Sequence, residues 1–285
     1  MEVVVSLHGA RRSADRAGRS VRESVVWTQY ESREAAASYA ASHEGDGPSA
    51  RYFHSRMHAI EQSLGEHRGG DLLDVGCGPG MLVRHLLDTR GGDLRITACD
   101  QSPAMVDAAR ERVGDIARLQ VARAECLPFP DASFDVVLAM GVLEYTDASC
   151  ALREAARVLR PNGLLLATML NPLSPYRLFE WVLYWPAVRL LGRLERVAGV
   201  PPERRHGVRT SGIRAVPPRR LRGKMRGVGL APDDVIHYDL TLLLPPFDKF
   251  VRRRTRSWRT HPERTIGRGV RGWMGTAYLV AARRT

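Results

Sequence analysis

DLLDVGCGPGMLVRHL, residues 71–86, holds three glycines and one proline within five positions. A strand-like stretch, LLDV (72–75), precedes the loop GCGPG (76–80), and residues 80–89 follow with the apolar spacing of a helix. Glycine has no Cβ, so its backbone can approach a ligand closely, and the first turn of a helix offers unpaired N–H groups. This stretch therefore predicts a ligand-binding turn between a buried strand and a helix.

Neighbouring residues narrow the class of ligand. A dinucleotide-binding loop would have glycine in place of Met81, and a triphosphate-binding loop would continue with Lys-Ser or Lys-Thr, where this chain has Leu82 and Val83. Asp74 precedes the first glycine by two residues, and Asp100 ends the next expected strand, where a carboxylate can accept hydrogen bonds from ribose hydroxyls. The two acids favour a nucleoside-containing ligand, with an unusual dinucleotide site as the alternative.

Strand and helix patterns alternate around the loop. Residues 28–66 have a helical pattern, strands are expected at 95–100, 118–122, 134–140 and 164–170, and Ser102 and Asp147 are expected to cap the helices between them. This alternation indicates a parallel, doubly wound α/β sheet. Beyond Asn171 the pattern changes, and residues 233–244 and 273–283 have strand patterns.

These patterns divide the chain into five parts. We expect a flexible tail at 1–24, a helical cap at 25–66, a ligand-binding core at 67–171, an aromatic and basic insertion at 172–229, and strands at 230–285 that complete the sheet. The apolar start followed by arginines is the reverse of a signal peptide, and no apolar run reaches the roughly 18 residues of a membrane span. With four cysteines that lack C-x-x-C spacing, the sequence predicts a cytoplasmic protein.

The net charge of +12 is unevenly distributed. Residues 1–170 contain 19 basic and 23 acidic side chains, whereas residues 171–285 contain 24 basic and 8 acidic ones. Arginine accounts for 41 of the 43 basic residues, a bias typical of a GC-rich genome, but such a bias acts on both halves. The basic C-terminal part therefore indicates an anionic surface or substrate.

Four motifs in order resemble the class I S-adenosylmethionine (SAM)-dependent methyltransferases. They are LLDVGCGPG (72–80), ACDQSPAMV (98–106), AECLPFPDASFDVVLAMGVLEY (124–145) and LREAARVLRPNGLLLATMLN (152–171). The most similar group contains the ubiquinone/menaquinone-biosynthesis and natural-product methyltransferases. The resemblance covers about 25–171 and the last strand, and it implies a Rossmann-like sheet of seven strands, the last of them antiparallel, with SAM as cofactor.

The resemblance also implies a role for individual residues. Gly76 and Gly78 would pack on the methionine part of SAM, with Asp74 near its ammonium group. Asp100 would hold the ribose hydroxyls, and Gln101 would flank the adenine. Ala124 and Glu125 would line the adenine edge, and Met140 would close over the cofactor. Tyr30 and Tyr39 resemble the aromatic lid residues, whose rings can make a cation–π contact with a sulfonium. Family members often have an acid where this chain has Arg123, which cannot accept a hydrogen bond from the adenine amino group.

Methyl transfer needs an aligned nucleophile, and it needs a base only where that nucleophile must lose a proton. Glu144 and Tyr145 follow the fourth expected strand at its carboxyl end, where family members often have Glu-His. His237, on a late strand, is the third candidate for a catalytic role. His54 and His58 share a helix face but lack a third ligand, so we expect no metal.

Segment 176–199 places aromatic residues, among them Phe179, Trp181, Tyr184 and Trp185, beside leucine, valine and arginine, and Pro186 should kink or split it. We expect this segment to cap a pocket for a small lipophilic acceptor, which can carry an anionic group: a natural product, a quinone or an isoprenoid-like lipid. An interfacial helix on an anionic membrane, a homodimer contact and an extra core helix are the alternatives for the segment.

For the whole chain, an RNA methyltransferase that uses the basic lobe is less favoured, because the aromatic residues lie among apolar ones. A non-catalytic SAM-binding protein is the other alternative, and no DNA partner is expected.

Overall fold

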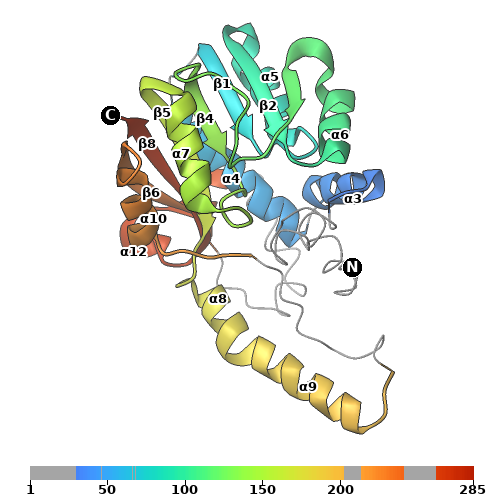
Figure 1. Ribbon diagram of the computed structural model, residues 1–285. Coiled ribbons are helices and arrows are strands. Elements are labelled where there is room, and N and C mark those ends of the chain that lie inside the picture. The colour runs from blue at the N-terminus through green and yellow to red at the C-terminus, as the bar shows by residue number, and fades with distance from the viewer. Residues whose placement is uncertain (1–29, 46, 66, 68, 202–212, 241–260) are drawn as a thin grey trace.

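A computed structural model describes residues 30–45, 47–65, 67, 69–201, 213–240 and 261–285. One mixed sheet of eight strands in the order β3-β2-β1-β4-β5-β8-β6-β7 forms the centre of this part of the chain (Figure 1). The strands are β1 (Gly70–Val75), β2 (Leu94–Asp100), β3 (Arg118–Val121), β4 (Phe134–Ala139), β5 (Leu159–Leu170), β6 (Leu230–Leu240), β7 (Ile266–Gly267) and β8 (Gly275–Arg284). The predicted tail 1–24 lies outside the described residues.

The order and direction of the strands confirm the Rossmann-like fold. Strands β3, β2, β1, β4 and β5 run parallel, and β8 lies antiparallel between β5 and β6. The expected number of strands was wrong, because the described residues form eight strands and not seven. The additional strand β7 pairs only Ile266 and Gly267 with Tyr238 and His237 of β6, and two residues are too short for an alternating pattern to reveal.

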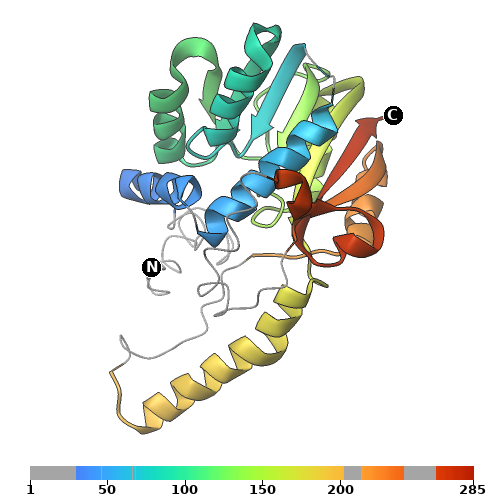
Figure 2. The same ribbon diagram turned by 180° about the vertical axis from the view of Figure 1, so that it is seen from behind.

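Helices cover both faces of the sheet (Figures 1 and 2). They are α3 (Arg33–Glu44), α4 (Pro48–Leu64), α5 (Met81–Arg90), α6 (Pro103–Val113), α7 (Ala148–Val158), α8 (Pro175–Phe179), α9 (Trp185–Val197), α10 (Pro218–Arg226) and α12 (Gly269–Gly272), with short 3₁₀ turns between some of them. Apolar side chains of α4, α5 and α6 pack with Leu72 and Leu138 on one face. Those of α7 and α10 pack with Leu73 and Val137 on the other, as the period-2 alternation of strands requires.

Two predicted caps begin the helices at the functional edge of the sheet. The Ser102 hydroxyl accepts a hydrogen bond from the N–H of Met105 at 3.3 Å, and Pro103 occupies the first helical position of α6. The Asp147 carboxylate accepts from the N–H groups of Ser149 and Cys150 at 2.8 and 3.1 Å. Both caps are confirmed, and they fix where the chain turns from a strand end into a helix.

Residues 175–197 form one continuous helical arm, which we call the arm from here on. It consists of α8, a π-helical turn at Glu180–Tyr184, and α9. Pro186 has no N–H to donate, and the turn before it is π-helical. There the Trp185 N–H donates a hydrogen bond to the carbonyl of Glu180, five residues back. The proline therefore neither kinks the arm sharply nor splits it, and the arm projects away from the sheet (Figures 1 and 2).

Candidate functional site

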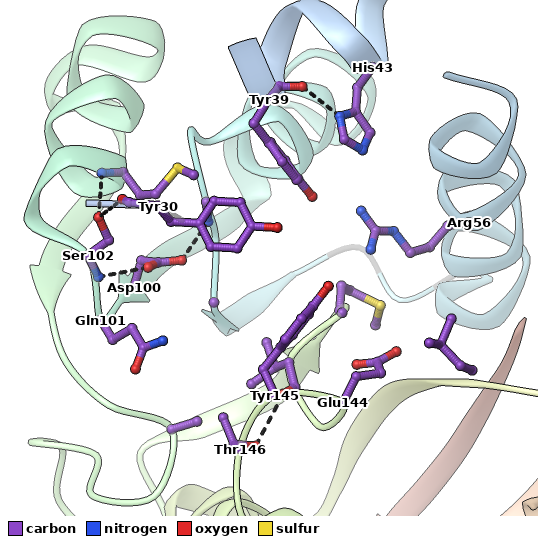
Figure 3. A pocket seen from close by; sticks show the side chains of 18 of the residues that line it. Tyr30, Tyr39, His43, Arg56, Asp100, Gln101, Ser102, Glu144, Tyr145 and Thr146 are labelled. Carbon is purple, nitrogen blue, oxygen red and sulfur yellow. Dashed lines mark hydrogen bonds between the residues drawn. The ribbon is translucent and has the colours of Figure 1, made fainter. Parts of the chain in front are cut away.

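A cavity of about 250 Å³ opens at the carboxyl ends of β1, β2 and β4 (Figure 3). The strand order reverses between β1 and β4, and open α/β sheets bind ligands at such a switch point. The lining side chains come from the N-terminal helices, the glycine loop and the segments that follow β2 and β4. They are Tyr30, Tyr39, His43, Tyr52, Arg56, Gly76, Gly78, Asp100, Gln101, Ser102, Met105, Ala122, Ala124, Met140, Gly141, Val142, Glu144, Tyr145, Thr146 and Leu170.

The glycine loop holds its backbone against both the sheet and the cavity. Gly76 and Gly78 have φ of +73° and +52°, in the left-handed region that favours glycine. A Cβ on Gly76 would lie 2.3 Å from Cγ2 of Val142, whereas a Cβ on Gly78 would meet nothing within 4 Å. The N–H groups of Gly76 and Cys77 donate to the Cys99 carbonyl at 2.7 and 3.0 Å. The loop is thus fixed to the end of β2, and Gly78 leaves space open on the side of the cavity.

Asp100 links this loop to the start of α6. Its two carboxylate oxygens accept hydrogen bonds from the N–H of Gly78 at 3.0 Å and from the N–H of Ser102 at 2.9 Å. Burial raises the pKa of Asp100, and these backbone donors oppose that rise. A carboxylate held in this way faces the cavity with acceptor capacity left for hydroxyl donors.

Asp74 is a buried carboxylate without a hydrogen-bond partner. Its side chain borders a narrower hollow behind the glycine loop, shared with Gly76 and Gly78, and neither oxygen accepts a hydrogen bond within the described structure. Burial raises the pKa of Asp74 to about 7, and the charge of nearby Arg56 opposes this only in part. An unpaired buried carboxylate is costly, so this position calls for a cationic group from a ligand.

Arg56 is the opposite charge at the same end of the cavity. It is 7% exposed, lines both the cavity and the hollow beside Asp74, and forms no ion pair within the part of the chain that the structure describes. Its guanidinium lies 5.6 Å from the ring centre of Tyr52 and 5.4 Å from that of Phe53. Sequence reasoning missed Arg56. The available signal was an arginine on the apolar stripe of α4, three residues after Phe53 and four before Ile60.

Glu144 and several tyrosines line the cavity near Arg56. Glu144 is 2% exposed, its Oε2 has no hydrogen-bond partner among the described residues, and burial raises its pKa to about 7. Figure 3 shows Tyr39, Arg56, Glu144 and Tyr145 pointing toward a common space. Burial raises the pKa of Tyr145 well above its usual value, which makes the phenol a poor base. Glu144 is therefore the better acceptor of a proton near neutral pH.

Aromatic rings close the cavity above this space. The ring of Tyr30 meets that of Tyr39 edge-on with centroids 5.7 Å apart, and the Tyr30 carbonyl accepts a hydrogen bond from the Ser102 hydroxyl at 2.6 Å. On the other side, the hydroxyls of Tyr52 and Tyr238 lie 3.0 Å apart. These contacts hold α3 and α4 over the carboxyl edge of the sheet and give the cavity an apolar, aromatic wall.

The structure brings together most of the residues that the sequence analysis singled out. Those that line the cavity are Tyr39, Gly76, Gly78, Asp100, Gln101, Ala124, Met140, Glu144 and Tyr145, and Asp74 borders the adjoining hollow. Glu125 does not line it, because its carboxylate accepts from the Asp147 N–H at 3.3 Å and lies 3.6 Å from Arg123. His237 does not line it either, and its ring lies 5.8 Å from that of Tyr278 on the neighbouring strand β8.

The expected cap over the cavity is not formed by the arm. None of the arm's side chains lines the cavity, although Leu170, at the end of β5 just before it, does. Within the described residues, no group of three or more His, Cys, Asp or Glu side chains is placed to hold a metal ion. The same part of the chain contains no helix that is both long and apolar enough to cross a membrane.

Comparison with known proteins identifies one domain of the chain. Residues 73–167 match the family model described as a methyltransferase domain. The chain is 35% identical over 138 residues to the ubiquinone/menaquinone biosynthesis C-methyltransferase UbiE of Hahella chejuensis, across 46% of this chain and 55% of that protein. It is 36% identical over 128 residues to the malonyl-[acyl-carrier protein] O-methyltransferase of Serratia marcescens, across 39% of this chain and 46% of that protein. The chain thus spans about half the length of the curated relatives it matches.

Solved structures agree on the fold. The geranyl diphosphate C-methyltransferase of Streptomyces coelicolor, in complex with Mg²⁺, geranyl diphosphate and S-adenosyl-L-homocysteine, superposes with a TM-score of 0.50 at 18% identity, covering 81% of this chain and 78% of that one. The sheet order and the glycine loop agree with this fold. The match identifies residues 73–167 as a methyltransferase domain of the SAM-dependent kind.

Proposed function

We propose that this chain transfers a methyl group from SAM to a small lipophilic acceptor, with Glu144 as the general base. The observation that carries this proposal is a pair of buried carboxylates near Arg56, one bordering the hollow beside the glycine loop and the other lining the cavity. Neither carboxylate oxygen of Asp74 accepts a hydrogen bond among the described residues, and the same holds for Oε2 of Glu144. One carboxylate suits the cofactor, and the other suits an acceptor that must lose a proton.

The cofactor half of the cavity fits the groups that SAM carries. Asp74 would hold the ammonium of its amino acid part and Arg56 the carboxylate, since these two side chains are the buried opposite charges at that end. Asp100 would accept hydrogen bonds from the ribose hydroxyls, and Gln101 and Ala124 would lie against the adenine. When bound, SAM supplies an electrophilic methyl group on a sulfonium.

The acceptor half combines a base with an apolar wall. Glu144 Oε2 would take the proton that the acceptor atom loses as its bond to the methyl carbon forms, and a carboxyl with a pKa of about 7 suits this exchange near neutral pH. Tyr39, Tyr52 and Tyr145 would exclude water and contact a lipophilic acceptor. Quinones, natural products and isoprenoid-like lipids are the acceptor classes that we propose, and the name of the Hahella chejuensis relative supports the first of these.

Radiolabelled methyl transfer tests this proposal. The full chain is incubated with methyl-labelled SAM and, in turn, a prenylated hydroquinone, an isoprenyl diphosphate and total tRNA. We expect label in one of the two lipophilic probes, at a rate that rises with pH through about 7 because Glu144 must be ionised to act. Glu144→Gln should lower the turnover rate by roughly 100-fold or more and leave S-adenosylhomocysteine affinity unchanged.

Glu263→Gln is the matched control, because Glu263 is an exposed glutamate outside the cavity. It should leave turnover unchanged. Label found only in tRNA would replace the proposal with RNA methylation through the basic lobe. Binding of S-adenosylhomocysteine without transfer to any probe would favour a non-catalytic SAM-binding protein.

A further inference from the structure

The arm, residues 175–197, exposes a large set of apolar side chains. It packs on the rest of the described structure only near its α8 end, and no residue of α9 is buried. Exposed apolar side chains run along its whole length: Leu178, Trp181, Val182, Leu183, Tyr184, Leu190, Leu191, Leu194 and Val197. Contiguous apolar surface of this kind is uncommon on a monomer and marks a site of interaction.

The apolar side chains follow a helical spacing. Leu183, Leu190, Leu194 and Val197 are separated by seven, four and three residues, which places them on one face of the helix. Their exposed fractions are 60, 57, 59 and 88%. Two aromatic residues, Trp181 and Tyr184, add to this surface nearer the body of the molecule. The arm is therefore amphipathic, with its apolar face directed to solvent.

A stripe of arginines runs beside the apolar face. Arg189, Arg193 and Arg196 are spaced by four and three residues, and none forms an ion pair with the described residues. The single described ion pair of the arm joins Arg177 to Glu180 at 2.6 Å, nearer the body. An apolar helix face flanked by arginines is typical of helices that lie in the interface of an anionic bilayer.

We propose that the arm docks on an anionic lipid bilayer, with its leucines and aromatic side chains among the acyl chains and its arginines at the headgroups. Charge complementarity favours a bilayer over a second copy of this chain, since two copies would bring their arginine stripes, Arg189, Arg193 and Arg196, together. An anionic surface neutralises the same stripe and attracts arginines that lie near it.

The position of the arm connects this surface to the cavity. The arm begins five residues after Leu170, which lines the cavity, and the Ser174 hydroxyl caps α8 by accepting from the Arg177 N–H at 3.3 Å. Docking would thus hold the cavity near the membrane, where a lipophilic acceptor is concentrated. This last step rests on the proposed function, whereas bilayer docking itself does not.

Vesicle sedimentation of the full chain tests the proposal. We compare vesicles of phosphatidylcholine alone with vesicles that contain about 30% phosphatidylglycerol, which makes their surface strongly anionic. We expect the chain to bind the anionic vesicles roughly tenfold or more tightly. Leu190→Gln with Leu194→Gln, which leaves the charge unchanged, should lower that binding by roughly tenfold. Replacing Arg189, Arg193 and Arg196 by Gln should lower it similarly.

Matched variants separate docking from a general attraction of a basic chain to an anionic surface. The first control, Ile116→Gln with Val121→Gln, removes two exposed apolar side chains outside the arm. The second control replaces Arg110, Arg118 and Arg153, also outside the arm, by Gln and so removes three charges. Both control variants should retain most of the vesicle binding. All variants should keep S-adenosylhomocysteine affinity, so a loss of vesicle binding is distinct from failure of the cofactor site.

Two results would overturn the proposal. The first is a vesicle assay in which the Leu190→Gln, Leu194→Gln variant binds as tightly as the wild type, or in which the wild type does not bind at all. The other is a wild-type mass in light scattering that is twice that of the same variant, which would assign the apolar face to a second copy of the chain.

Discussion

Asp74→Asn should change both the strength and the pH dependence of cofactor binding. The Asp74 carboxyl is buried without a hydrogen-bond partner, and its pKa in the free protein is raised to about 7. If it binds the ammonium of SAM, binding favours the ionised form and lowers this pKa. The affinity should therefore fall as the pH drops below 7, because a proton must first leave Asp74.

The size of this effect follows from the raised pKa. With a pKa of about 7, roughly nine-tenths of Asp74 is ionised at pH 8 and roughly one-tenth at pH 6, so the affinity should fall about tenfold, or about 1.4 kcal/mol, between these values. Asparagine keeps the shape of the side chain but cannot ionise. The variant should bind roughly 10-fold to 150-fold more weakly at pH 8, from the value of a charged hydrogen bond, and show little pH dependence.

Isothermal titration calorimetry with S-adenosylhomocysteine at pH 6, 7 and 8 measures both quantities. Asp71→Asn is the control on the same strand, because hydrogen bonds from Arg95 lower the pKa of Asp71 and keep it ionised throughout this range. The control should retain the wild-type pH dependence. Equal affinity of wild type and Asp74→Asn at pH 8, or a wild-type affinity that does not change between pH 6 and pH 8, would refute the role of Asp74.

Three further predictions concern the same cavity. Asp100→Ala should weaken S-adenosylhomocysteine binding by roughly 10-fold to 150-fold in calorimetry, and binding at the wild-type level would remove Asp100 from the site. Gly76→Ala should lower the free energy of unfolding in urea by roughly 1–3 kcal/mol, because its Cβ would lie 2.3 Å from Val142, and an unchanged denaturation midpoint would show that the loop yields. The raised pKa of Glu144 gives stability that is fully present below its ordinary value of 4.5 and is lost as the pH rises through about 7. Glu144→Gln should therefore reduce the loss of stability between pH 5 and pH 8, by up to roughly 3 kcal/mol, and a pH dependence identical to that of the wild type would contradict the raised pKa.

The parallel half of the fold could be predicted from the sequence because its signals are local. Strands buried on both faces are continuous apolar runs, and the caps at Ser102 and Asp147 are side chains that act within three residues. The glycine loop also carries its own signal, since the positive φ of Gly76 and Gly78 is a property of the loop itself. The two-residue strand β7 lacks such a signal, because only its pairing with β6 defines it.

The site was harder to predict where it depends on tertiary contacts. Arg56 belongs to the cavity because α4 crosses the carboxyl edge of the sheet, and nothing near it in the sequence distinguishes it from a solvated arginine except its place on an apolar stripe. Glu125 turns away from the cavity because the Asp147 N–H and Arg123 are available on the other side. The aromatic content of 176–199 predicted contact with something apolar, but whether that is the cavity or an outside surface depends on the direction in which the arm leaves the sheet.

A crystal structure of the chain with S-adenosylhomocysteine would show whether this cavity is the cofactor site. We expect the ligand at the carboxyl ends of β1 and β2, with its ribose hydroxyls hydrogen-bonded to Asp100, its ammonium against Asp74, and its sulfur directed toward the space beside Glu144. A ligand bound elsewhere, or one in this cavity whose ribose and ammonium contact neither aspartate, would contradict it.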